Sequence, residues 1–431
     1  MNPKDPSRLF GNIEEMMWGN ELLDKCSEGF LKVFCWNGIY IFLVLLISII
    51  FTIPAILIPQ NDVIEYPEYW WELIVQTFIG VIPSGINTYL ECKTIFRYKF
   101  LASNGFLARL TGVLIITTVP CSAISIVGWI WILKYNLPIP FFALAIYLVS
   151  TMIHLTHLWY EFPLELRAEE SEKKRIHSYF WYRLWFIFYG YQNYGLKFIL
   201  LGIPTSFQPV MAIIFPLARE MNLIILSKFL EKAINPDVTA GIVPKLTATI
   251  AVNIIHAFFV TLIIASNATK TTSNCILAVE FLFNIYSTYR IFHLNRKTHP
   301  KDNVRSMEEM EYESQKKEEA LDLFAVESVE YLVPLIYTVT FLIAYYGPNA
   351  NIIGNVRMTR WKFQGVEDVK SYTEQILKMF AIDLASLIIS MTLLFKFASV
   401  NMLREGYKVM KLFWPLIAVK IGSKIYQVEV K

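Results

Sequence analysis

Long apolar runs, separated by short groups of polar residues, dominate the chain. A helix needs about 20 apolar residues to cross the hydrocarbon core of a bilayer. The runs of about this length are 33–58, 73–92, 110–133, 138–159, 184–205, 208–227, 246–267, 274–292, 328–347 and 375–397. This pattern predicts an all-α protein, a polytopic membrane bundle of about ten transmembrane helices. A further apolar stretch, 412–419, is too short to span and is expected at the interface or packed under the bundle.

The distribution of Lys and Arg predicts the orientation of this bundle. Basic residues concentrate in alternate loops, and cytoplasmic loops are the ones that normally carry them. Segment 1–32 and segment 398–431 are therefore expected in the cytoplasm, the latter in part at the interface, with the bundle over 33–397 between them. Loop 348–372 is the exception. It carries four basic residues on the expected outer face, so it either folds over the mouth of the bundle or marks a misplaced span.

The segment 298–327 is the longest polar stretch after the first span. It mixes Glu and Lys at helical spacing and shows no apolar core of its own. We expect a solvated surface helix in a cytoplasmic loop, with a regulatory contact as the alternative.

Composition supports a membrane protein and excludes several other classes. Of 431 residues, 55% are hydrophobic and 17% are charged, whereas about 25% are charged in an ordinary soluble domain. Disordered, coiled-coil and disulfide-scaffold proteins do not fit this composition. The net charge of +3 gives no reason to expect a nucleic-acid partner. The five cysteines have no CxxC spacing, which argues against a zinc site or a disulfide framework.

The acidic N-terminal segment lacks the basic start and the nearby cleavage site of a signal peptide. The first span is therefore expected to act as an uncleaved anchor. The lipid bilayer is the one partner that this pattern implies, in the plasma membrane or an internal membrane.

Ionisable residues inside the apolar runs are the main functional signal. Such groups are costly in a bilayer and usually face the interior of the bundle. Counted at about 1.5 Å per residue, Glu280, Asp383 and Arg219 lie about 9 to 16 Å below the outer edge, and Glu220 and His256 are level with Arg219. With Lys197, such a layer would be nearly charge-balanced. We predict that Arg219 pairs with Glu280 or Asp383. The candidate residues for binding a solute or ion are Arg219, Glu220, His256, Glu280, Asn284 and Asp383.

Two other features accompany this layer. Pro216 removes a backbone hydrogen bond beside the Arg219–Glu220 pair, and broken helices often form substrate sites in transporters. His154, His157 and Glu161 share one face of the run 138–159. Two imidazoles and a carboxylate can bind a transition metal, and Glu91 would be a further ligand. A hydrogen-bond network or a proton path is the alternative for this group.

The sequence favours a transporter or channel for a small solute or ion. It contains no P-loop, HExxH, GxSxG or kinase signature, so no nucleotide site or other cofactor is expected. One alternative is a membrane-embedded lipid-modifying enzyme with His256 as general base, although no paired catalytic motif accompanies that residue. A lipid scramblase or a receptor is the other. A polar stripe on the lipid-facing side would support scrambling, and a large closed outer pocket would support a receptor.

Overall fold

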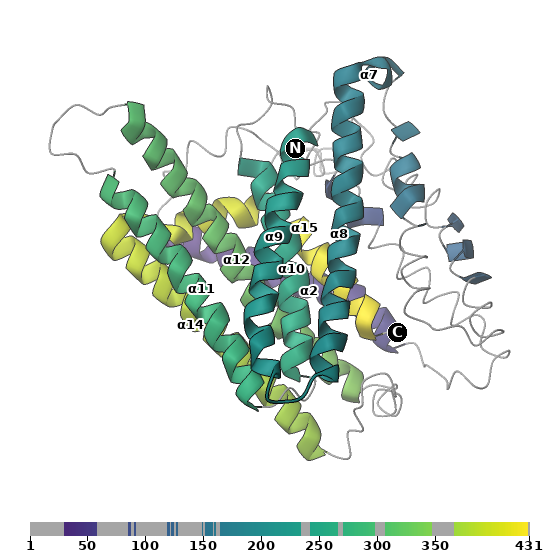
Figure 1. Cartoon of the computed structure of the whole chain (residues 1–431), viewed down its shortest axis with the longest axis vertical. Coiled ribbons are helices and arrows are strands. Elements are labelled where there is room, and N and C mark those ends of the chain that lie inside the picture. Colours follow the sequence, from purple (N-terminus) through teal and green to yellow (C-terminus); the bar gives the residue numbers. More distant parts are fainter. Residues whose placement is uncertain are drawn as a thin grey trace, which may run out of the picture.

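A computed structural model of the chain describes residues 30–57, 164–233, 242–265, 270–297, 307–346 and 366–429, with short pieces between 85 and 160. These residues are almost entirely helical, and none of them forms a strand (Figure 1). The helices are α2 (Phe30–Leu57), α7 (Leu164–Ala168), α8 (Glu170–Gly202), α9 (Gln208–Ala233), α10 (Ile242–Ala265), α11 (Lys270–Lys297), α12 (Met307–Tyr346), α14 (Val366–Ala398) and α15 (Met402–Glu429). The all-α prediction is confirmed for this part of the chain.

Within the described residues, six helices are long and apolar enough to cross a membrane: α2, α9, α10, α11, α12 and α14. They coincide with six of the apolar runs in the sequence. The run 184–205 belongs to α8, which is not among the six because its Tyr, Gln and Asn residues lower its hydropathy. The runs 73–92, 110–133 and 138–159 lie largely outside the described residues. The six helices are compatible with an integral membrane protein, and the count of ten spans and the cytoplasmic termini stay predictions.

Helix α10 is the central element of the bundle. Its apolar part is buried at every residue from Leu246 to Ile264, and the helix contacts α8, α9, α11, α12, α14 and α15. The sequence explains this position, because a helix that is apolar on every side is stable only when other helices surround it. A polar side chain on α10 is therefore enclosed by protein.

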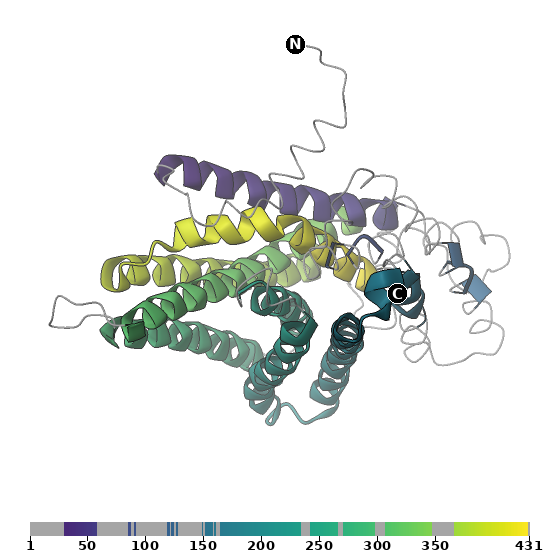
Figure 2. The same ribbon diagram turned by 90° about the horizontal axis from the view of Figure 1, so that it is seen from above.

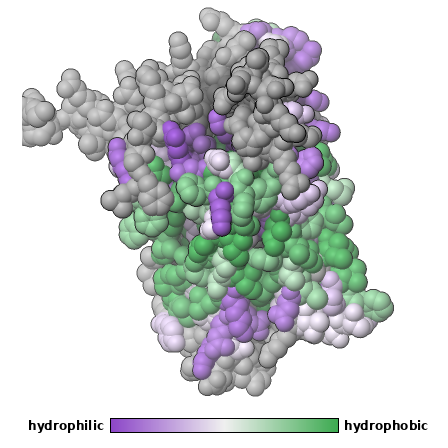
Figure 3. Space-filling model, turned by 90° about the vertical axis from the view of Figure 1, so that its left-hand side faces the viewer, coloured by the Kyte–Doolittle hydropathy of each residue, from purple (hydrophilic) through white to green (hydrophobic). Residues whose placement is uncertain are grey.

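The outward faces of the peripheral helices are apolar. Leu217 and Met221 of α9, Leu282 of α11 and Ile388 of α14 are all more than half exposed. Figure 3 shows the same feature on one side of the molecule, where a broad hydrophobic band lies between two polar regions. A band of this kind suits contact with lipid chains, and soluble monomers rarely expose apolar patches of this extent.

The apolar stretch 412–419 belongs to a much longer helix than its sequence suggested. It lies within α15, which packs along α2 over most of its length (Figure 2). Asn37 Nδ2 donates to Leu403 O at 3.0 Å, and Ser48 Oγ donates to Ala418 O at 2.9 Å, so the two helices run in the same direction. Phe413 and Ala418 are fully buried. The stretch packs within the helix bundle rather than at an interface or underneath it.

A sharp turn between α14 and α15 starts this extra helix. Ser399 adopts a left-handed backbone conformation with φ of 54°, and α15 begins three residues later. The Asn401 side chain accepts a hydrogen bond from the Arg404 N–H at 3.2 Å. This is the contact of an N-terminal helix cap, which satisfies a backbone donor that has no partner inside the helix. Asn401 thus gives α15 a defined first turn.

The segment 298–327 was expected to form a solvated surface helix, and its later part is instead largely buried. Residues from Met307 onward belong to α12, a single helix of 40 residues that continues to Tyr346. From Lys316 onward most side chains are buried, including Leu321 and Phe324. At 1.5 Å per residue this helix is about 60 Å long, twice the hydrocarbon thickness of about 30 Å. The polar and the apolar parts of the segment are therefore one continuous helix, and its acidic residues near 327 lie inside the bundle.

Candidate functional site: a buried charge cluster

Arg219 is the central cation of the predicted layer, and it contacts three carboxylates. Its Nη1 donates to Glu280 Oε2 at 3.2 Å and to Glu330 Oε1 at 2.9 Å. Its Nε lies 3.4 Å from Glu220 Oε1. The predicted pairing with Glu280 is confirmed. Glu330, on α12, was not expected in this layer.

His256 and Asn284 extend the same network. His256 Nε2 lies 2.7 Å from Glu280 Oε1, while its Nδ1 has no hydrogen-bond partner among the described residues. Asn284 Nδ2 donates to Glu330 Oε2 at 2.9 Å. The nitrogen-bearing side chains of α9, α10 and α11 thus meet the carboxylates of Glu280 and Glu330. Four of the predicted residues, Arg219, His256, Glu280 and Asn284, lie together as the sequence suggested.

A second part of the cluster lies between α11, α12 and α14. Glu327 Oε1 accepts hydrogen bonds from Ser386 Oγ at 3.0 Å and from Ser390 Oγ at 3.3 Å. Ser390 Oγ is also 3.1 Å from Thr288 Oγ1. Asp383 lies one helical turn before Ser386 on α14 and interacts electrostatically with Glu327, Glu330 and Glu280. Its Oδ2 is buried without a hydrogen-bond partner in the described part of the structure, as is Oε2 of Glu327.

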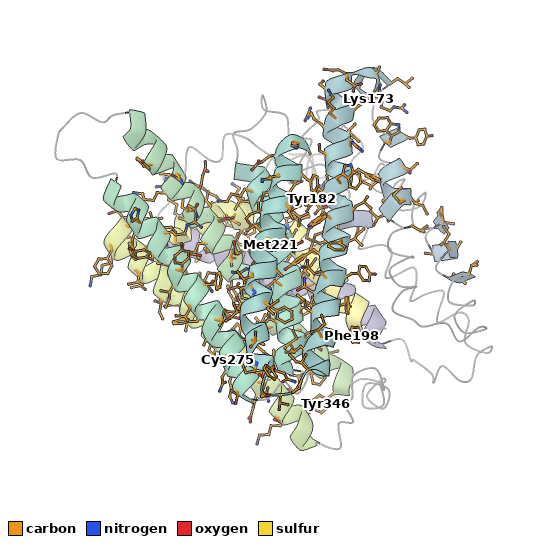
Figure 4. All side chains as sticks on the ribbon, in the orientation of Figure 1. Lys173, Tyr182, Phe198, Met221, Cys275 and Tyr346 are labelled. Atoms are coloured by element: carbon orange, nitrogen blue, oxygen red, sulfur yellow. The ribbon has the colours of Figure 1, made fainter. Side chains whose placement is uncertain are left out.

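All the ionisable groups of the cluster except Glu220 are enclosed by protein. Arg219, His256, Glu280, Glu327, Glu330 and Asp383 are each at most 5% exposed. The side chain of Glu220 is 45% exposed, so this predicted residue lies at the edge. In Figure 4, Met221 of α9, two residues from Arg219, lies midway between Lys173 at one end of the bundle and Cys275 toward the other. The cluster is therefore at mid-height.

The charge balance differs from the sequence-based expectation. Glu327 and Glu330 add two buried acids to Glu280 and Asp383, and among the described residues these four face two basic groups, Arg219 and His256. The expected layer was nearly neutral because it set three acids against Lys197, Arg219 and His256. It did not include Glu330, or Glu327, which precedes the predicted span 328–347. The sequence held a signal that could have found both: Leu321, Phe324 and Ala325 form an apolar stretch directly before them. Buried charge in a bundle calls for counter-ions, so the acidic excess is the distinctive chemical property of the site.

Helix α9 passes the charge cluster without a break. Pro216 lies inside it, yet α9 is helical from Gln208 to Ala233. The expectation that this proline interrupts the helix is wrong. Arg219 is therefore presented by a continuous helix, whose position the packing against α8, α10 and α11 fixes.

A second buried charge group contains Glu91, which was expected as a further metal ligand. Its other members are side chains of α8 and α15. Glu91 pairs with Arg183 Nη1 at 2.6 Å and with Lys420 Nζ. Tyr182 OH donates to Glu91 at 2.9 Å, and Lys420 Nζ also lies 4.5 Å from the centre of the Phe186 ring. Two cations thus share the Glu91 carboxylate, which is the centre of an ion-pair network.

The proposed metal group is not seen in the described residues. His154 is buried and His157 is half-buried, while Glu161 lies outside the described residues. Across the parts of the chain that the structure describes, no set of three or more His, Cys, Asp or Glu side chains is arranged to hold a metal ion.

Comparison of the chain with protein families, with curated proteins and with solved structures finds no match. The functional argument therefore depends on the chemistry of the buried cluster.

Proposed function

We propose that the protein is an integral membrane transporter or channel for a small solute or ion, with the mid-bundle charge cluster as its binding layer. The observation that carries this proposal is the convergence of Arg219, His256, Glu280, Glu327, Glu330 and Asp383 from five helices. Apolar packing and hydrogen bonds are enough to hold membrane helices together. Ionisable groups at this depth cost about 2.5–3.5 kcal/mol each on insertion scales, and they typically mark substrate and ion pathways.

The acidic excess favours a cationic or proton-coupled substrate. The buried part of the cluster has four carboxyl groups and two basic side chains, and a cation or a proton compensates the difference. The groups lie on α9, α10, α11, α12 and α14, so a relative movement of these helices would change the distances between them. Relative movement of helix groups around a binding site is how many transporters expose it alternately to the two sides of a membrane.

The alternative functions have less support in the described residues. Scrambling predicts a polar stripe on a lipid-facing surface, whereas the outward faces of α9, α11 and α14 are apolar. An enzyme with His256 as base predicts access from the lipid, whereas α10 is buried over its whole apolar length. Transport through the interior agrees better with polar groups that lie inside and apolar groups that lie outside.

The test is electrical recording from the purified protein in a planar bilayer under defined ion and pH gradients. We expect a current, or in proteoliposomes a flux, that Asp383→Asn reduces at least about tenfold, because the substitution removes one of the site's charges. Glu374→Gln is the matched control, since this acid lies on the same helix and is exposed. Absence of both current and flux, or an equal effect of the two substitutions, would contradict the proposal.

A further inference from the structure

The buried cluster consists of two chemically different halves. In one half, every carboxylate meets nitrogen donors: Glu280 contacts Arg219 and His256, and Glu330 contacts Arg219 and Asn284. In the other half, formed by Thr288, Glu327, Asp383, Ser386 and Ser390, the contacts recorded are between oxygen atoms alone. Arg219 and His256 form no hydrogen bond or ion pair with either carboxylate of this oxygen half.

Helix geometry brings the members of the oxygen half together. Asp383, Ser386 and Ser390 are spaced three and four residues apart, so they share one face of α14. Glu327 contacts both serines, and Tyr331 contacts Phe380 with ring centres 6.4 Å apart. A later residue of α12 thus contacts an earlier residue of α14, which shows that the two helices are antiparallel. Asp383 consequently faces the turn of α12 between Glu327 and Glu330.

Two carboxylate oxygens in this half lack a partner. Glu327 Oε2 and Asp383 Oδ2 are both buried, and neither receives a hydrogen bond from the described residues. A buried polar atom without a partner destabilises the folded protein, and more so when the atom is charged.

The hydroxyl groups of Ser386 and Ser390 donate hydrogen bonds to Glu327. Each hydroxyl oxygen also has lone pairs with which it can bind a cation. Arg219 interacts with Glu327 electrostatically but forms no ion pair with it in the described structure. Among the described residues, this half therefore has more hydrogen-bond acceptors than donors.

We infer that Thr288, Glu327, Asp383, Ser386 and Ser390 form a binding site for a hard cation, of the class of Na⁺ or Ca²⁺. Carboxylate and hydroxyl oxygens are the ligands that such cations prefer, whereas zinc and copper select imidazole and thiolate. The cation supplies the contact that the two unpartnered carboxylate oxygens lack, and it offsets the acidic excess. That this cation is the transported or coupled ion rests on the proposed function, whereas its binding does not.

Thermal unfolding of the detergent-purified protein tests the site without any transport. A ligand that binds the folded state raises the unfolding midpoint in a saturable manner. NaCl, KCl and CaCl₂ are each titrated against choline chloride at constant ionic strength, in mildly acidic and in mildly alkaline buffer. We expect a saturable rise with Na⁺ or Ca²⁺ that choline does not produce, and the titration identifies which of the two ions binds.

Substitution of the hydroxyl ligands assigns this effect to the site. Ser386→Ala and Ser390→Ala remove one ligand oxygen each with little change in shape, and we expect each to weaken cation binding about tenfold or more. Thr392→Ala is the control, because Thr392 lies on the same helix with an exposed side chain and bonds to the Ile388 carbonyl. If either serine variant proves too unstable, direct binding of radioactive Na⁺ or Ca²⁺ by the other variant gives the same answer.

Three results would overturn the inference. The first is no difference between choline and the other cations at either pH. The second is a cation effect that survives both serine substitutions. The third is stabilisation by acidic buffer alone, which would mean that protons occupy the carboxyl groups. Cation binding without any flux would support this site and contradict the proposed function. Flux without cation binding would support the proposed function and contradict this site.

Discussion

At the scale of single residues, the ion pairs of this protein share partners. Arg219 contacts three carboxylates, and Glu91 contacts two cations. In such a group the effect of a substitution depends on how many opposite charges it leaves behind. Removing one member of a buried ion pair commonly costs about 3–5 kcal/mol, because the other charge then lies unpaired in a medium of low polarity.

The Glu91 group gives a prediction from this asymmetry. Glu91→Gln deprives both Arg183 and Lys420 of the carboxylate that they share, so we expect a loss of about 3–5 kcal/mol in stability. Lys420→Met leaves the Arg183–Glu91 pair intact and replaces the ammonium with an apolar chain, so we expect a clearly smaller loss. The measurement is the midpoint of thermal unfolding in detergent. Equal losses in the two variants would show that the charges do not share one carboxylate.

At the scale of helices, close packing decides which surfaces meet. Gly406 of α15 is buried and lies against the ring of Phe324 on α12, and a Cβ atom added at this glycine would overlap that ring. The absence of a side chain at Gly406 therefore permits α15 to approach α12. This contact also positions the part of α12 just before Glu327, so it influences the charge cluster indirectly.

The glycine contact is testable with a matched pair of substitutions. Gly406→Ala forces the Phe324 ring to move, and overpacking of this kind costs about 1–3 kcal/mol. Gly195→Ala on α8, where nothing lies near the added atom, should leave stability unchanged or raise it by up to about 1 kcal/mol. Thermal unfolding measures both. Phe324→Leu should recover part of the loss in Gly406→Ala, and a Gly406→Ala protein as stable as the parent would contradict the proposed contact.

At the scale of the whole molecule, six apolar helices with an apolar outer band enclose a cluster of buried charged groups. A soluble protein has the opposite distribution at its surface. Helix α12 crosses the bundle as one continuous element, so Met307 and Tyr346 lie at its opposite ends. This arrangement makes the sidedness of the chain accessible to experiment.

The topology prediction concerns the segments 298–306 and 347–365, which lie outside the described residues. Single cysteines introduced into each, with the five native cysteines replaced by serine, can be labelled with a membrane-impermeant maleimide in intact cells. If the protein resides in the plasma membrane, we expect labelling of 347–365 from outside and of 298–306 only after permeabilisation. For an internal membrane, the same comparison is made on sealed vesicles. Labelling of both segments from the same side would contradict a spanning α12.

The sequence by itself determined the class of the protein and part of its site. Apolar run length is a local property, so the six helices that are long and apolar enough to cross a membrane could be located from it. The spacing of Asp383, Ser386 and Ser390 indicated their shared face, and depth counting placed Arg219 and Glu280 within one layer of the bundle. Where a polar stretch leads directly into an apolar one, as before Glu327, local composition did not reveal that a single helix continues through both.

Tertiary structure alone decided the partners of the charged groups. Whether an acid on one helix meets an arginine or a serine on another depends on rotation and depth of packing, which the periodicity of one helix does not contain. For this reason the two halves of the cluster and the pairing of Lys420 with Glu91 came only from the structure. Likewise, α15 is long enough to pack along α2, but its burial follows from Gly406 and the neighbouring helices rather than from its own modest hydropathy.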